Sequence, residues 1–318
     1  MSKPYYIIGN LVVLRKKNTI YVMSKSERKP LPVEGIKSLF CIGSVTVKAG
    51  ALKMLLRRGI PVHFFGHHGD YIGSALPLNK HTSGTALIKQ VEHYTNKEKR
   101  LEIAHEIVRG IRKTIRWTLR KLGDQRYKEI EPSIKAESIY ELLGYESNAW
   151  NMLYDSLSRK LEEKGILFIG RAKRPPTDRV NAIISYTNSI LYATALSEIM
   201  HTPLDPRIGF LHETYEKRFA LSLDIADLFK PLITPRVVVR AANRGLRDEW
   251  FHKDVGIFLT NTGKRAITAE IEKILTTTVK HPTLRRNISI RYAMRLEAYK
   301  LLKHIIGDKK YKAFSPWW

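Results

Sequence analysis

The sequence predicts an α+β protein, with a small β-rich N-terminal domain at residues 1–76 followed by a larger all-α C-terminal domain at residues 86–318. In the first part, short apolar runs alternate with turn residues, which is typical of strands. In the second part, apolar residues recur at intervals of three and four, which predicts helices. Residues 77–85 contain proline, asparagine, serine and glycine, and this composition predicts a linker between the domains.

Most of the N-terminal domain is expected to be sheet. The first two apolar runs flank Gly9-Asn10, a pair that favours a tight turn between strands. One helix is expected at residues 48–58, where apolar residues share a face and the following glycine is suited to end the helix. The expected strands are residues 5–8, 11–14, 20–23, 38–42 and 62–65, with a turn at 67–70 leading into residues 71–73.

The C-terminal domain is expected to be a set of long helices separated by prolines. Pro203, Pro231 and Pro235 stand between periodic segments, where a proline interrupts helical hydrogen bonding. Residues 311–318 are expected to be irregular. The expected helices are residues 86–123, 134–164, 178–200, 217–230, 236–250 and 265–304.

The charge balance points to a polyanionic partner. Lysine and arginine number 55 against 30 aspartate and glutamate, a net charge of +25. The excess is spread along the chain, with 13 basic against 3 acidic residues in 1–85 and 42 against 27 in 86–318. Releasing counterions from a phosphate backbone is the usual gain for such a surface, so nucleic acid is the favoured partner. A ribosomal-type or membrane-surface protein is the alternative.

Several other classes of protein are disfavoured. No apolar run approaches the ~20 residues that a membrane span needs. The N-terminus lacks the apolar core and the cleavage site of a signal peptide. The single cysteine, Cys41, excludes an intramolecular disulfide and a Cys-rich zinc site. We therefore expect a cytoplasmic protein with no membrane segment.

Two acidic residues stand out in an apolar helical segment. Asp224 and Asp227 are three residues apart and therefore share a face. Two like charges among leucine, isoleucine and phenylalanine are costly unless a cation or a proton compensates them. The alternative is a solvated acidic face near a helix end. By contrast, His67, His68 and Asp70 lie at an expected turn, where such residues are common for backbone reasons, so a metal site there is disfavoured.

Glu146 and His212 are two further candidate ligands. Each has a structural alternative, because a carboxylate near a helix N-terminus interacts with the dipole and a lone histidine after an apolar pair is commonly structural. Together with Asp227 they would supply oxygen, nitrogen and oxygen ligands, a set that suits Mg²⁺ or Mn²⁺. Such a metal polarises a phosphate and lowers the pKa of an attacking water or 3′-hydroxyl.

The spacing of two of these residues makes a geometric prediction. His212 and Asp227 are 15 residues apart, which is about 22 Å along a straight helix. One metal ion cannot bridge that distance, since its ligands lie only about 2 Å away. We therefore expect the chain to bend between His212 and Leu221. One continuous helix from residue 212 to 227 would rule out a shared site.

Arginines repeat at intervals of four, four and three in one expected helix. A row of guanidinium groups on one face can follow a DNA backbone, since phosphate contacts position a nucleic acid without reading its sequence. A solvated charged face is the alternative. The candidate DNA-binding residues are Arg236, Arg240, Arg244 and Arg247.

Six short segments of the chain follow one another in a characteristic order. In the C-terminal part they are Arg171 to Tyr186, Gly209-Phe210-Leu211-His212-Glu213 and Leu221 to Pro231. In the N-terminal part they are Gly43 to Thr46, Leu56 to Val62 and Gly69 to Gly73. The ordered set is specific, although no single motif is, and it runs nearly the whole length of the chain. It resembles a known family, the CRISPR-associated integrase, which is the universal nuclease-integrase of CRISPR adaptation.

The resemblance implies a metal-dependent DNA endonuclease/integrase that forms a homodimer and works with the small ferredoxin-like partner protein of CRISPR adaptation. The family's catalytic metal ligands would fall on Glu146, His212 and Asp227, with Asp224 as the neighbouring carboxylate. The cofactor would be Mg²⁺ or Mn²⁺. The implied reaction is transesterification, in which a 3′-hydroxyl of a foreign DNA fragment attacks a phosphodiester at a CRISPR repeat boundary. Water in place of that hydroxyl would hydrolyse DNA.

Two other functions stay open on the sequence alone. One is a different metal-dependent nuclease for DNA repair or restriction, which would cleave DNA without joining strands. The other is a non-catalytic nucleic-acid-binding scaffold. Its function would survive alanine substitutions at Glu146, His212 and Asp227.

Overall fold

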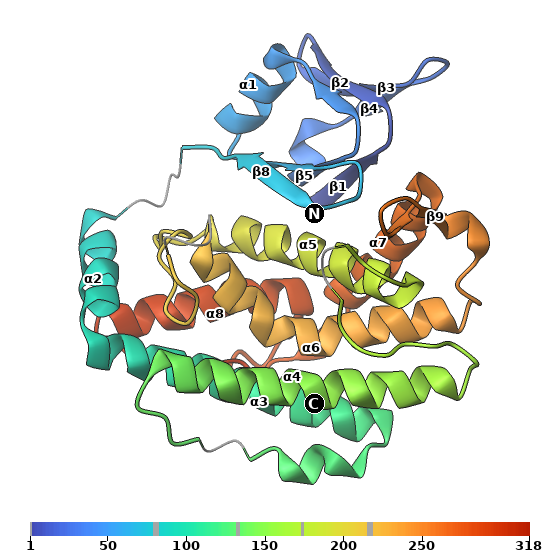
Figure 1. The fold of residues 1–318 in the computed structure, drawn as a ribbon. Helices are drawn as coiled ribbons and strands as arrows, with labels where there is room; N and C mark the ends of the chain where they lie inside the picture. The colour runs from blue at the N-terminus through green and yellow to red at the C-terminus, as the bar shows by residue number, and fades with distance from the viewer. Residues whose placement is uncertain (1, 79–82, 132–133, 173–174, 215–218) are drawn as a thin grey trace.

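The computed structural model describes residues 2–78, 83–131, 134–172, 175–214 and 219–318. A strand-rich N-terminal part lies over a helical part (Figure 1), as the α+β prediction requires. Part of the expected linker, residues 79–82, lies outside the described residues, so the boundaries at 77 and 85 stay a prediction. No helix in the described ranges is both long enough and apolar enough to cross a bilayer.

Two four-stranded sheets and one helix form the N-terminal part. One sheet has the strand order β1-β5-β7-β8 and the other β4-β3-β2-β6. Apolar side chains between the sheets and α1 form a core of their own, in which Val13, Leu39 and Leu55 are fully buried. The elements are β1 (Lys3–Ile8), β2 (Leu11–Lys16), β3 (Thr19–Met23), β4 (Arg28–Leu31), β5 (Ile36–Ile42), β6 (Val45–Val47), α1 (Ala49–Arg57), β7 (Val62–Phe65) and β8 (Tyr71–Ala75).

The prediction of a turn at Gly9-Asn10 that joins two paired strands is wrong. β1 pairs in parallel with β5, whereas β2 pairs with β3 and β6 in the other sheet. Gly9 has a φ of 110°, which favours glycine, and the chain crosses there between the sheets. The reason lies in β5, an almost entirely buried strand that takes β1 and β7 as its two neighbours. The expected hairpin at residues 67–70 is confirmed, since β7 and β8 pair antiparallel.

The helical part contains the expected helices with three corrections to their limits. The segment 86–123 divides at Asn96, whose side chain accepts a hydrogen bond from the backbone of Lys99 and caps a new helix. The segment 265–304 divides at a short β-hairpin, so the C-terminal part is not purely helical. The elements are α2 (Gly84–Thr95), α3 (Lys97–Leu122), α4 (Ile139–Glu162), α5 (Arg179–Ile199), α6 (Ala220–Ala242), β9 (Phe251–Lys253), β10 (Ile257–Leu259), α7 (Asn261–Thr276), β11 (Thr278–Lys280), β12 (Asn287–Ser289) and α8 (Ile290–Ile305).

The third correction concerns α6, which runs through Pro231 and Pro235 although two helices were expected there. The proline nitrogen at 235 cannot donate to the carbonyl of Pro231, and Thr118 Oγ1 on α3 donates to that carbonyl instead, at 3.0 Å. Packing also stabilises α6, because this helix lies among α3, α5 and α7 and is buried on almost every side.

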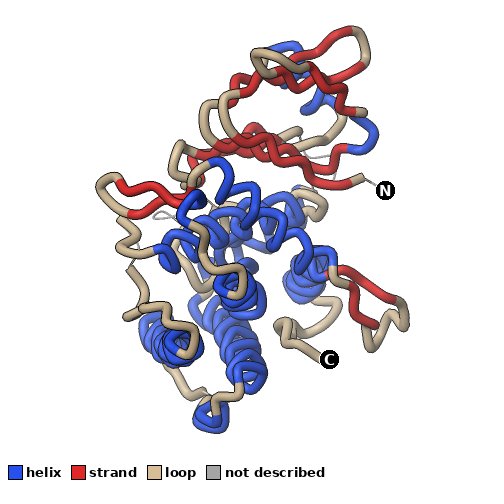
Figure 2. The backbone as a smooth tube through the Cα atoms, turned by 90° about the vertical axis from the view of Figure 1, so that its right-hand side faces the viewer, coloured by secondary structure: helices blue, strands red, loops and turns tan. Residues whose placement is uncertain are grey.

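The sheet containing β1 rests on the helices (Figure 2). Phe40, Ile42 and Phe65 from this sheet belong to the same apolar core as the helices. Polar contacts join the same surfaces, including Lys37 on β5 with Glu198 on α5 at 2.5 Å. The two parts therefore share one packed interface, in which Lys264 on α7 donates to the carbonyl of His67 and holds the β7–β8 turn against that helix.

Candidate active site

The loop before α6 is held against the first turns of that helix by one carboxylate. Asp224 Oδ2 accepts hydrogen bonds from the backbone nitrogens of Phe210 and Leu211, at 2.6 and 3.2 Å. Its Oδ1 accepts from the backbone nitrogen of His212 at 3.1 Å and contacts His212 Nδ1 at 2.8 Å. Asp224 is fully buried, so these bonds replace the water that the charge has lost.

Gly209 allows this close approach and was not singled out from the sequence. A Cβ atom at this position would lie 2.8 Å from the backbone carbonyl carbon of Ala220 and 3.0 Å from Asp224 Oδ2. Only glycine therefore fits between the loop and the start of α6. The Gly-x-Leu-His pattern has a steric reason here, which the sequence alone did not supply.

The predicted bend between His212 and Leu221 is confirmed. α6 begins at Ala220, and the described residues 209–214 are not helical. The backbone nitrogen of Leu221 donates to Pro206 at 3.1 Å, so the chain folds back on itself before α6. This return brings His212 Nε2 within 3.6 Å of Asp227 Oδ2.

Both ring nitrogens of His212 face carboxylates. Burial by itself lowers the pKa of this imidazole, but its hydrogen bond to Asp224 and the charges of Asp224, Asp227 and Glu146 outweigh burial and raise the pKa to about 9. The ring is therefore positively charged at neutral pH in this arrangement. Nδ1 is fixed by Asp224, which leaves Nε2 as the nitrogen that faces Asp227.

Glu146 reaches the same place from α4. Its carboxylate is buried, and Trp150 Nε1 donates to Oε1 at 3.1 Å. Burial raises the pKa of Glu146 to about 7, and the nearby negative charge of Asp227 adds to the rise. The structure thus brings together the three residues that the sequence selected from separate segments, although their roles stay predictions.

Lys230 also belongs to this cluster. Its ammonium group forms an ion pair with Asp227 Oδ1 one helical turn away. The lysine is mostly buried, as is Asp227, so each charge compensates the other. The i, i+3 spacing with Asp227 is a signal by which the sequence could have indicated it.

The side chains fit a hard divalent cation in chemistry but not yet in arrangement. Two buried carboxylates and one imidazole are donors that suit Mg²⁺ or Mn²⁺. Within the described ranges, however, no three His, Cys, Asp or Glu side chains are placed to hold a metal ion as they stand. The ammonium of Lys230 and the protonated ring of His212 neutralise the carboxylates in this arrangement. A metal ion could bind only if Lys230 left Asp227 and His212 lost its proton.

A cleft of about 920 Å³ opens beside the cluster. Lys230 is common to the cleft and the cluster, which connects the two. The β7–β8 turn forms one wall, where His68 stacks on Phe258 with ring centroids 3.9 Å apart. The other polar lining residues include Arg171, Ser185 and Asn188.

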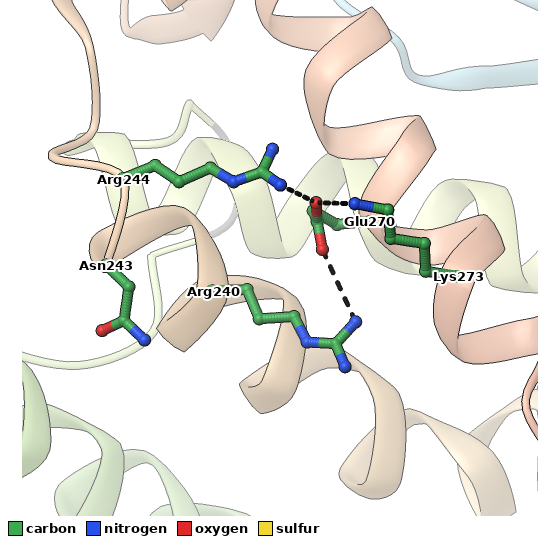
Figure 3. A pocket seen from close by; sticks show the side chains of 5 residues that line it. All are labelled: Arg240, Asn243, Arg244, Glu270 and Lys273. Carbon is green, nitrogen blue, oxygen red and sulfur yellow. Dashed lines mark hydrogen bonds and ion pairs between the residues drawn. The ribbon is translucent and has the colours of Figure 1, made fainter.

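The four predicted DNA-binding arginines do not form one helical row. α6 ends at Ala242, so Arg244 and Arg247 lie beyond it rather than on the expected helix 236–250. Arg240 and Arg244 instead converge on Glu270 of α7, at 3.5 and 2.7 Å (Figure 3). Arg247 pairs with Glu249 at 3.7 Å, and burial lowers the pKa of Arg236.

Comparison with known proteins identifies the family. The sequence matches the family described as CRISPR associated protein Cas1 over residues 5–273. The CRISPR-associated endonuclease Cas1 of Pyrococcus horikoshii is 38% identical over 320 residues, which cover 99% of each chain. The chain therefore belongs to the Cas1 family, and the predicted class of enzyme, a CRISPR-associated endonuclease, is confirmed.

Solved structures agree with the fold. A Cas1 protein from Thermotoga maritima superposes with a TM-score of 0.89 at 34% identity, covering 99% of this chain and 100% of its own. A casposase bound to an integration product gives a TM-score of 0.85 at 22% identity, with coverage of 98% and 93%. At that identity the casposase shows that the fold is shared and nothing more.

Proposed function

We propose that the protein is a metal-dependent DNA endonuclease and integrase that joins foreign DNA fragments to a CRISPR array by phosphodiester transesterification. One observation carries the proposal. A cluster of buried Glu146, half-buried His212 and buried Asp227 adjoins a cleft through Lys230, in a Cas1-family chain whose net charge is +25. The casposase that shares this fold was solved with an integration product, which agrees with strand joining.

The catalytic roles are assigned to the three clustered residues. Mg²⁺ or Mn²⁺, when bound, would polarise the phosphate and favour the ionised form of the attacking water or 3′-hydroxyl. Glu146, His212 Nε2 and Asp227 would be its ligands. Asp224 has its oxygens engaged by the 210–212 backbone and by Nδ1, so we assign it to positioning His212. Lys230, once released from Asp227, would contact phosphate in the cleft.

DNA would approach through the cleft and along the arginines. Arg236, Arg240, Arg244 and Arg247 are proposed to contact the backbone, because guanidinium groups bind phosphates without reading sequence. A more distant neighbour, 18% identical with a TM-score of 0.79 over 97% of this chain and 35% of its own, was solved in a Cas6-RT-Cas1–Cas2 complex. We propose a homodimer, a cytoplasmic location and a small ferredoxin-like partner for this chain.

The decisive experiment measures cleavage and joining of DNA with a repeat-bearing plasmid in Mg²⁺ or Mn²⁺. Wild type should both cut and join, whereas His212→Ala should do neither. Cleavage without joining would instead favour a repair or restriction nuclease. If alanine at Glu146, His212 and Asp227 in turn leaves the activity intact, the cluster is not catalytic.

Asp224→Asn tests the positioning role. An amide cannot accept from three backbone nitrogens and the imidazole as a carboxylate does, so His212 should lose its fixed orientation. We expect metal affinity or activity to fall about 10- to 100-fold. Manganese affinity of the folded variant, measured by calorimetry, separates this role from a loss of fold. Glu213→Gln is the control, because Glu213 lies in the same loop but pairs with Arg100; an equal loss there would contradict the assignment.

Metal affinity should rise with pH. In the metal-free protein the pKa of Glu146 is raised from 4.5 to about 7 and that of His212 from 6.5 to about 9. Both groups hold protons more tightly when folded, so their contribution to stability is present at low pH and is lost as pH rises through 7 and 9. Ligation needs both protons released. We expect manganese to bind at least about tenfold more tightly at pH 8.5 than at pH 6, and His212→Ala to flatten the dependence. Equal affinity at both pH values would contradict it.

A further inference from the structure

Three cations converge on one carboxylate at the end of α6 (Figure 3). Glu270 on α7 contacts Arg244 Nη2 at 2.7 Å, Lys273 Nζ at 3.2 Å and Arg240 Nη1 at 3.5 Å. Together with Asn243 these residues line a pocket of about 450 Å³. Three positive side chains against one negative leave the pocket with a charge of +2.

The two sides of this cluster differ in exposure. The Glu270 side chain is only 4% exposed, whereas Arg240, Arg244 and Lys273 are 39%, 44% and 58% exposed. The carboxylate thus lies at the base and the cations form the open rim. Each guanidinium has five N–H donors and the ammonium three, so contact with Glu270 uses only some of the donors on the side chains that line the pocket. Asn243 adds an amide beside them.

We propose that this pocket binds one phosphate group, with Glu270 holding the three cations together while the pocket is empty. A tetrahedral anion with several acceptor oxygens matches a fork of arginine donors and a lysine point charge. Lys273 on α7 becomes a binding residue that the arginine spacing did not indicate. The assignment of the phosphate to a DNA backbone rests on the proposed function, whereas the pocket itself does not.

The alternative is that Glu270 has only a structural role and joins α6 to α7 by ion pairs. The two possibilities predict different effects of Glu270→Gln. If the carboxylate competes with phosphate, its neutral isostere should tighten phosphate binding. If its role is only structural, the substitution should lower the melting temperature and leave phosphate binding unchanged.

The experiment compares full-length wild type, Lys273→Ala and Glu270→Gln. The slope of log affinity for DNA against log salt is measured by fluorescence anisotropy. Lys273→Ala should reduce the slope by about 0.7–0.9, the change expected when the protein neutralises one phosphate fewer, and Glu270→Gln should tighten binding. Lys303→Ala is the matched control, since Lys303, on α8, is 55% exposed and pairs at 2.8 Å with Asp308, which lies just after that helix. An equal change in Lys303→Ala would overturn the proposal.

A second arm titrates inorganic phosphate and follows it by ³¹P NMR. A change in the DNA slope alone identifies the backbone as the source of the phosphate. Binding of inorganic phosphate that disappears in Lys273→Ala identifies a free anion. If Lys273→Ala changes neither the DNA slope nor the binding of inorganic phosphate, the proposal is overturned. This test does not depend on whether Glu270→Gln folds, because Lys273 is exposed and is tested separately. Metal-dependent cleavage by wild type against His212→Ala reports on the proposed function independently.

Discussion

Glu146→Gln is expected to abolish metal-dependent DNA cleavage and joining while leaving the protein folded. With a pKa raised to about 7, Glu146 is often protonated in the metal-free protein, and glutamine resembles that neutral form. Glutamine cannot ionise, so it cannot supply the anionic oxygen that a divalent cation needs. Since losing even a supporting residue of a metal site costs 10- to 100-fold, a direct ligand should cost about 100-fold or more.

The measurement is a rate of DNA cleavage and joining in Mg²⁺ or Mn²⁺, with a thermal melt of the metal-free variant. The melting temperature should stay close to that of wild type, because glutamine has the size of the protonated carboxyl and its oxygen can still accept the hydrogen bond from Trp150 Nε1. Glu162→Gln, on the exposed end of the same helix, is the matched control and should keep full activity. Activity surviving in Glu146→Gln would remove this residue from the ligand set.

Glu198→Ala should give the largest loss of stability. Glu198 is fully buried between Lys37 Nζ at 2.5 Å and Arg295 Nη2 at 2.9 Å, so it joins the sheet to α5 and α8. Burial raises the pKa of its carboxyl, but the two cations outweigh burial and lower it. Removing the carboxylate leaves two largely buried cations uncompensated, and we expect a loss of about 3–5 kcal/mol.

Urea unfolding at neutral pH measures this loss. Glu27→Ala is the control, because its ion pair with Lys29 at 3.0 Å is exposed and should be worth no more than about 1 kcal/mol. A comparable change in the two variants would mean that the buried triad contributes no more than a surface pair. Because the folded-state pKa of Glu198 lies below its ordinary value of 4.5, the wild type should lose this contribution only as pH falls below about 4.5, and that acid sensitivity should be smaller in Glu198→Ala.

The fold could be predicted from the sequence wherever the local pattern and the tertiary environment favour the same structure. The short strands and the hairpin at 67–70 follow from short-range rules, and the structure has them. The bend before Leu221 follows instead from the requirement that His212 and Asp227 share one site, and the structure has it as well. The candidate site was predicted from two signals. Acidic residues in apolar surroundings need a compensating charge, and the resemblance to the CRISPR-associated integrase places its ligands on Glu146, His212 and Asp227. These residues come from three separate segments, and the fold brings them together.

The predictions are wrong where residues far along the chain determine the local structure. Pro235 does not end α6 because Thr118, on another helix, satisfies the carbonyl that the proline leaves free. Gly9-Asn10 does not form a hairpin because β5, some 30 residues later, takes β1 as its partner. Arg240 and Arg244 both contact Glu270, so they line a pocket and do not form part of the expected helical row. None of these partners is visible from local spacing.

The contacts that join the sheet to the helices have a consequence for biosynthesis. Tyr6 bonds Glu272, the carbonyl of Ile8 accepts from Arg265, and Lys37 pairs with Glu198, across 266, 257 and 161 residues of chain. Contacts of such long range close after local ones, and the ribosome releases the N-terminus first. The interface of the sheet that carries Phe40 is therefore complete only after α7 has been synthesised. We expect docking of the two parts to be a late folding step, and until then the nascent chain exposes an apolar sheet surface that is prone to association.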